Sequence, residues 1–125
     1  MNNFYELEII NNPRRGEENI TSLKLEQAFD AFKPKISIIL QYIADKNIIK
    51  TNSLEKFVAS LKSKKWESEE HLANHIIHQF YDQTLPFFVD LKLEASNTST
   101  HKIYLVKKQP SYKITEMLKP VLYPL

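Results

Sequence analysis

Two kinds of hydrophobic periodicity, each confined to its own stretch of the chain, set the strongest limit on what this sequence can fold into. Within residues 89–93, apolar side chains alternate with charged ones, which is the pattern of a β-strand with one buried face. Within residues 54–61, apolar side chains instead recur every three or four positions, as in an amphipathic helix. Since such a strand needs a cover for its apolar face, the sequence predicts an α+β domain in which helices pack on a sheet.

The neighbouring segments extend the same plan. The β-branched run over residues 36–43 predicts a buried strand, and residues 103–106 predict a strand that forms a hairpin with residues 89–93. Ser53 and Ser68 are each expected to cap an amphipathic helix, because a serine hydroxyl can accept a hydrogen bond from a first-turn amide. Acidic residues directly after Ser68 suit the positive end of the helix dipole.

Residues 20–32 fit two interpretations. Leu23 and Leu25 alternate with polar residues, which is typical of a strand, whereas the apolar residues of 25–32 also fit a helical stripe. We favour the strand, which gives the sheet four strands and the order strand, strand, helix, helix, strand, strand. The helical alternative would make the chain a small α+β interaction domain, such as an immunity or regulatory protein.

Composition bounds the class of protein. The 125 residues make one domain, which we divide into an irregular segment 1–19, a folded part 20–108 and a C-terminal tail 109–125 with room for a short helix. The net charge of +2 is too small to make nucleic acid the default partner. With no cysteine and a single glycine, Gly16, the chain can form neither thiolate chemistry nor a glycine-rich phosphate loop. No apolar run approaches the ~20 residues of a membrane span, so we expect a cytoplasmic protein without a membrane partner.

Several local motifs resemble the tunnelling fold, the family group of dihydroneopterin aldolases, pyruvoyl-tetrahydropterin synthases and 7-cyano-7-deazaguanine nitrile reductases of queuosine synthesis. The strand at 38–43 and the Asp45–Lys46 turn are similar to a strand and turn of the nitrile reductases, and the likeness spans about residues 23–95. Residues 53–57 lie where that family has its signature. Glu70 and Asn74, with the isoleucine two positions later, keep the spacing of its Glu-x-x-x-Asn-x-Ile element.

This resemblance implies a four-stranded antiparallel sheet with two helices on one face, whose copies join into an oligomeric barrel with ligand sites between subunits. It implies that Glu70 holds the N–C–N edge of a purine-, deazapurine- or pterin-like heterocycle, because a carboxylate offers two acceptor oxygens to two parallel N–H donors. Glu94 is the nearest match to the ligand-anchoring glutamate of the pyruvoyl-tetrahydropterin synthases. The competing interpretation of Glu70 is an ordinary first-turn acid of a capped helix.

The chain departs from the nitrile reductases at the residues that carry their reaction. Gln27 falls where those enzymes have their nucleophilic cysteine, and Pro34 where they have an aspartate. The acid and two lysines of the nicotinamide-binding signature are replaced by Lys50, Asn52 and Glu55. A covalent thioimide cannot form without a thiol, so we expect no cysteine-dependent nitrile reduction and no cofactor. Whether the protein is an enzyme is left open, and the alternative is a catalytically silent structural or partner-binding subunit.

Other polar clusters are given structural interpretations. His71, His75 and His78 form a stripe that could chelate zinc, but we expect no metal and a stripe that faces solvent or a partner. The lysines at 62–65 beside Trp66 are interpreted as a solvated helix end rather than a nucleic-acid contact. A small-molecule heterocycle and other copies of the chain are therefore the expected partners. If the protein is an enzyme, the candidates for general acid or base are His71, Glu94 and Lys92. Aromatic residues that either line a pocket or belong to the core are Phe87, Phe88, Tyr104, Tyr112 and Tyr123.

Overall fold

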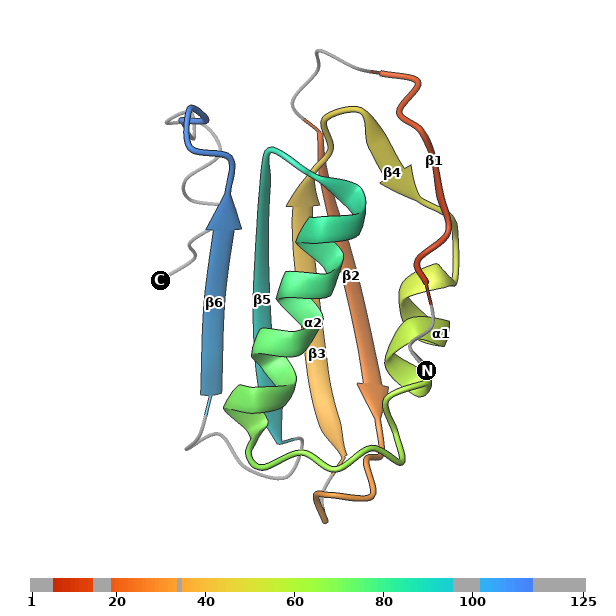
Figure 1. Ribbon diagram of the computed structural model, residues 1–125, viewed down its shortest axis with the longest axis vertical. Helices are drawn as coiled ribbons and strands as arrows, with labels where there is room; N and C mark the ends of the chain where they lie inside the picture. The colour runs from red at the N-terminus through yellow and green to blue at the C-terminus, as the bar shows by residue number, and fades with distance from the viewer. Residues whose placement is uncertain (1–5, 15–18, 34, 96–101, 114–125) are drawn as a thin grey trace.

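The computed structural model describes residues 6–14, 19–33, 35–95 and 102–113 as a sheet covered on one face by two helices (Figure 1). Neither helix in this part of the chain is long and apolar enough to cross a membrane. The elements are β1 (Ile9–Asn11), β2 (Ile20–Gln27), β3 (Ile36–Ile43), β4 (Asn47–Ile49), α1 (Ser53–Ala59), α2 (Glu69–Thr84), β5 (Phe88–Ala95) and β6 (Lys102–Lys108).

The main sheet has the strand order β2-β3-β5-β6, and every neighbouring pair is antiparallel. Its register aligns Leu23, Leu40, Leu91 and Leu105 in one row across the four strands, all on the same face. The strand over residues 20–27 is thus confirmed, and the alternative that makes this segment a helix is wrong. The leucine row explains why: the apolar residues of β2 align with the apolar row of the sheet only when the segment is extended.

Both helices lie over the leucine face (Figure 1). The core face predicted for α2 is confirmed, since Leu72, Ala73, Ile76 and Phe80 are all fully buried. Phe80 meets the ring of Tyr42 from β3 edge-on, with the ring centroids 5.0 Å apart. Fully burying side chains of this size stabilises the fold by roughly 2 kcal/mol each, which makes the helix-to-sheet contact the main source of stability.

The opposite face of the sheet, which we call the open face, carries a second and smaller apolar cluster. Ile43 and Phe88 are fully buried there, although the helices lie on the other side. The chain after β6 folds back over them, so that Tyr112 stacks on Phe87 with ring centroids 5.3 Å apart. The Gln109 side-chain amide donates to the Leu85 and Pro86 carbonyls, at 3.3 Å each, and to the Asp45 carboxylate at 3.2 Å. The short helix considered for residues 114–118 lies outside the described residues.

A separate two-stranded sheet forms from β1 and β4, and it corrects the expectation that residues 1–19 are irregular. Residues Ile9 to Asn11 pair with Asn47 to Ile49, and the ladder continues in a 2.8 Å bond from the Lys50 amide to the Glu8 carbonyl. The Leu7 amide also donates to the Gln83 side chain of α2 at 2.7 Å. Three-residue strands are too short to show a periodicity, so the sequence carried no signal for this pair.

The start of α1 differs from expectation as well. The capping position is Asn52, not Ser53, and the Asn52 side chain makes no capping hydrogen bond. The Ser53 hydroxyl instead accepts a 2.7 Å bond from the Glu8 amide, which ties the N-terminal segment to the helix. At α2 the prediction is confirmed, because the Ser68 hydroxyl accepts from the His71 amide at 3.1 Å.

Candidate functional site

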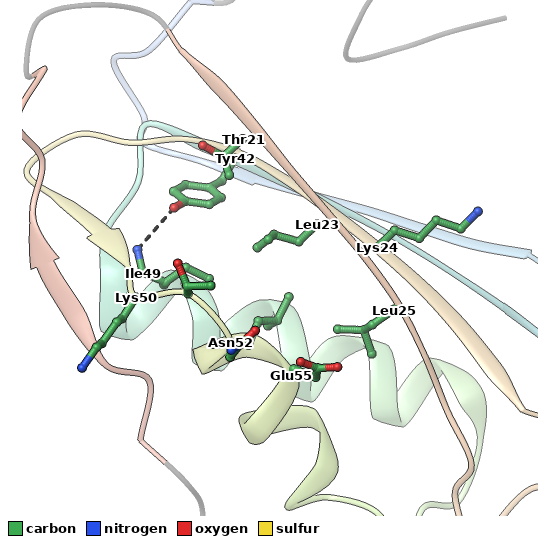
Figure 2. A pocket seen from close by; sticks show the side chains of 11 residues that line it. Thr21, Leu23, Lys24, Leu25, Tyr42, Ile49, Lys50, Asn52 and Glu55 are labelled. Carbon is green, nitrogen blue, oxygen red and sulfur yellow. Dashed lines mark hydrogen bonds between the residues drawn. The ribbon is translucent and has the colours of Figure 1, made fainter.

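A cavity of about 310 Å³ lies on the helix side of the sheet, between the outer strand β2, the end of β4 and the start of α1 (Figure 2). Its apolar lining comes from β2, β3, β4 and α1 and consists of Leu23, Leu25, Tyr42, Ile49 and Leu54. Its polar lining is Thr21, Lys24, Lys50, Thr51, Asn52 and Glu55. We call this space the β2 cavity. An apolar floor with a few polar groups at the rim is the usual character of a small-molecule pocket.

Tyr42 forms the rigid back wall of the β2 cavity. The side chain is only 2% exposed, and its hydroxyl accepts a 3.3 Å bond from the Ile49 amide, as the dashed line in Figure 2 shows. Burial raises the pKa of Tyr42 above its ordinary value of 10.0, while the bonds with Ile49 and Thr21 act in the opposite direction. The phenol therefore stays neutral near neutral pH and serves as a wall and a hydrogen-bonding group rather than as a base.

The rim of the β2 cavity is set by an unusual backbone conformation. Asn52 has a positive φ of 69°, a region in which asparagine is favoured among residues with a side chain. This turn brings Asn52 and Glu55 to the same side of the helix start, where both line the cavity (Figure 2). The side chains of Lys24 and Lys50 extend outward in the same view, and the Lys50 ammonium lies 3.5 Å from the Glu8 carboxylate.

The three positions that replace the nicotinamide-binding signature, Lys50, Asn52 and Glu55, thus gather at one cavity. They do not fit a nicotinamide nucleotide. The Lys50 ammonium points outward, and the Glu55 carboxylate would repel the phosphates of such a cofactor. An amide and a carboxylate above an apolar floor suit instead a flat, neutral or cationic ring that carries N–H donors.

Glu70 lies elsewhere, in the first turn of α2, where it is exposed and lines none of the cavities described here. Its backbone carbonyl accepts a 2.9 Å bond from the Asn74 side chain, which is the second residue of the motif. Glu94 lies on the open face of the sheet, 3.8 Å from the Lys102 ammonium. Within one chain the structure therefore does not bring the two candidate carboxylates together. The role of Glu70 stays a prediction.

The histidine stripe is only partly directed at solvent. His71 and His78 are exposed, but His75 is half-buried between the rings of Phe57 and Trp66. The centroid of the His75 ring lies 6.3 Å from that of Phe57 and 5.2 Å from that of Trp66. Burial, with smaller contributions from His71 and Lys64, lowers the pKa of His75 below 6.5. Among the described residues no group of three His, Cys, Asp or Glu side chains is placed to hold a metal ion.

The Trp66 side chain makes contacts within the folded domain. Its indole N–H donates to the Leu61 carbonyl at 3.1 Å, and its ring packs edge-on against His71. Lys62 and Lys65, which follow the end of α1 in the chain, are exposed, as the interpretation of a solvated helix end expected. The absence of a nucleic-acid partner stays a prediction.

Sequence reasoning missed one buried acid. Asp90 on β5 was counted as a solvent-facing position of an alternating strand, but it is 1% exposed and its Oδ2 accepts a 2.9 Å bond from the Tyr104 hydroxyl. Burial raises the pKa of Asp90 to about 6, and the Tyr104 bond, the charge of Lys92 and a Gln41 backbone bond counteract only part of this effect. The signal was unavailable in the sequence because it depends on the pairing of β5 with β6.

A comparison with solved structures finds the apo form of the archaeosine synthase QueF-Like, with a TM-score of 0.56 and 16% sequence identity, over 75% of this chain and 96% of that one. No protein-family model matches the sequence, and no curated protein matches it significantly. At this identity the likeness concerns the fold alone. The shared fold, an antiparallel sheet with helices on one face, is consistent with the tunnelling fold that the motifs indicated.

Proposed function

We propose that the protein binds a planar purine-, deazapurine- or pterin-like heterocycle between adjoining copies of the chain, with Glu70 of one copy facing the β2 cavity of the next. The observation that carries this proposal is the position of Glu70 and of the β2 cavity at opposite edges of the sheet. The β2 cavity opens at one outer strand of the sheet, and α2 begins beside the other outer strand, β6 (Figure 1). Edge-to-edge contact between copies would bring them to one interface.

The strand directions support such a contact. The sheet has four strands, and each neighbouring pair is antiparallel, so the outer strands β2 and β6 run in opposite directions. A β6 strand of one copy can therefore pair with β2 of the next in the same antiparallel pattern. Pairing would satisfy the backbone groups that an outer strand otherwise exposes, and a closed ring of copies would leave no exposed edge.

The chemistry of the two parts is complementary. Glu70 supplies two acceptor oxygens at the start of α2, and these suit two parallel N–H donors. The β2 cavity supplies an apolar floor for the ring, with Asn52 and Glu55 at the rim. Because the chain contains no cysteine, any reaction at this site proceeds without a covalent thioimide. The proposed activity is binding, and a catalytic step is not assigned.

The first experiment compares Glu70→Gln with Glu69→Gln, a matched change of the neighbouring first-turn acid. Thermal-shift measurements with pterin, guanine and 7-deazaguanine derivatives are expected to show stabilisation of the wild type, because a ligand that binds the folded state raises its stability by mass action. Glu70→Gln should weaken binding about tenfold or more, and Glu69→Gln should leave it unchanged. Equal binding by all three proteins would remove Glu70 from the site.

The second experiment tests the interface. Light scattering at micromolar concentration should give a mass that is a multiple of 14.7 kDa. A proline at Glu26, an exposed position of β2 outside the cavity lining, would remove a backbone donor from the outer strand and is expected to weaken assembly and ligand binding together. A wild-type monomer that still binds the heterocycle would show that the site is complete within one chain.

A catalytically silent structural subunit is the second candidate. The observation that favours it is the loss of reactive groups at matched positions: Gln27 replaces the cysteine, and the Lys50 ammonium pairs with Glu8 outside the β2 cavity. Such a subunit would assemble in the same way, but no heterocycle would raise its melting temperature. The ligand screen therefore separates the two candidates.

A further inference from the structure

A second cavity, of about 280 Å³, lies on the open face of the sheet, where β3, β5 and β6 adjoin, and we call it the open-face cavity. It is separated from the β2 cavity by the sheet itself, since the latter lies on the helix side. Its lining residues are Ser37, Ile39, Lys92, Leu93, Glu94, Lys102, Ile103 and Tyr104. No part of the function proposed above uses it.

The least exposed polar residue in the lining of the open-face cavity is Ser37. Ser37 is 8% exposed, and within the described parts of the chain its hydroxyl makes no hydrogen bond. The hydroxyl oxygen is still reachable from the cavity, so a ligand oxygen can replace water as its hydrogen-bond partner.

Lys92 gives the open-face cavity its charge. The side chain is half-buried on β5, and no carboxylate within the described residues lies at ion-pair distance from it. Its ammonium lies 5.6 Å from the centroid of the Tyr104 ring, which is a weak contact for a cation. Glu94, the acid in the lining, pairs with Lys102 at 3.8 Å instead. The lining thus holds two ammonium groups and one carboxylate.

Tyr104 is held in place by a residue behind the lining. Its hydroxyl donates to the buried Asp90 carboxylate at 2.9 Å, although the residue is 40% exposed on an outer strand. This bond fixes the orientation of the ring beside Lys92 before any ligand arrives. A preformed wall of this kind lowers the entropy cost of binding.

We propose that the open-face cavity binds a small organic molecule through its carboxylate or phosphate group, with the oxygens held by the Lys92 ammonium and the Ser37 hydroxyl. Ile39 and the Tyr104 ring contact the carbon skeleton of that molecule. The volume admits a molecule of metabolite size and excludes a polymer from the interior of the site. This site is independent of the heterocycle site, because the sheet lies between them.

The test uses citrate and inorganic phosphate as probes, in calorimetric titrations at constant ionic strength. Wild type should bind at least one of them, and the preferred probe distinguishes a carboxylate ligand from a phosphate ligand. Lys92→Gln and Ser37→Ala should each weaken binding about tenfold or more, because each removes a hydrogen bond to a charged group. Lys108→Gln is the matched control: it lies on the same face of β6 outside the lining and should bind as the wild type does.

Two outcomes would overturn the proposal. One is the absence of binding by either probe up to about 10 mM, a concentration that would reveal even a weak site. The other is an equal loss in Lys92→Gln and Lys108→Gln, which would indicate a general effect of net charge. Glu70→Gln should bind both probes as the wild type does, so failure of this site and failure of the heterocycle site can be told apart.

Discussion

The buried carboxylate of Asp90 makes the stability of the protein depend on pH in a direction opposite to that of a typical surface acid. In the folded chain, burial raises the pKa of Asp90 from 3.8 to about 6. An unfolded chain loses this proton near 3.8, whereas the folded protein keeps it up to about 6. Between these values unfolding therefore releases a proton, and the free energy of unfolding falls as the pH rises.

The size of the effect follows from the shift. A raised pKa of about two units corresponds to about 3 kcal/mol, since each unit is worth 1.36 kcal/mol. The contribution of the protonated carboxyl is fully present below pH 3.8 and is lost as the pH rises through about 6. A single domain has a total stability of about 5–15 kcal/mol, so a loss of this size is readily measured.

Asp90→Asn isolates this contribution, because the amide has nearly the same shape and does not titrate. Urea unfolding of both proteins should be measured at several pH values from below 3.8 to above 6. The unfolding free energy of the variant minus that of the wild type should rise by about 3 kcal/mol across this window. Other titrating groups cancel in the difference.

Tyr104→Phe provides a second measurement with a stated direction. The Tyr104 bond lowers the pKa of Asp90, so its removal should move the fall in stability to higher pH. The reasoning is refuted if the difference between Asp90→Asn and the wild type is the same at every pH, because Asp90 would then ionise alike in the folded and unfolded chains.

Three further predictions concern the ends of α2 and the ring cluster beside it. Leu85→Gly should raise the free energy of unfolding by about 1 kcal/mol in urea titrations. Leu85 is 54% exposed, and its left-handed backbone, with φ 49°, favours glycine. A destabilised variant would contradict this. Ser68→Ala should lower the free energy of unfolding by about 1 kcal/mol through loss of the cap to the His71 amide, whereas Ser63→Ala, at an exposed position, should have little effect. His75 should titrate below 6.5 by NMR because burial lowers its pKa. Trp66 fluorescence should change over the same pH range in the wild type but not in His75→Gln. The neutral imidazole stabilises the fold above pH 6.5, and this contribution is lost as the pH falls through the lowered pKa.

The parts of the fold that the sequence predicted are those with a repeated pattern. The strand at 89–93 and the core face of α2 each place several apolar residues on one side, and burial of that side decides both the element and its orientation. Ser68 was recognisable because the cap, the following acids and the apolar stripe agree with one another. Local patterns of this kind predict the structure correctly because tertiary packing buries the same residues that the pattern places on one side.

The parts that escaped prediction depend on contacts between distant segments. Serine is a common helix-capping residue, but the Ser53 hydroxyl accepts a hydrogen bond from the backbone amide of Glu8, 45 positions earlier. The β2 cavity combines residues from β2, β3, β4 and α1, and the buried Asp90 is explained only by the position of Tyr104 on the neighbouring strand. The resemblance singled out Lys50, Asn52 and Glu55 as replacements of one signature, but it predicted neither that they line one cavity nor that Lys50 extends outward.

The N-terminal segment has a consequence for the order in which the chain can fold. The Leu7 amide bonds to Gln83, a partner 76 positions later, and β1 needs β4 as its second strand. During synthesis these residues leave the ribosome well before Gln83, the most distant of their partners, does. Closing so long a loop is slow, so we expect the segment to be the last part of the chain to dock during folding.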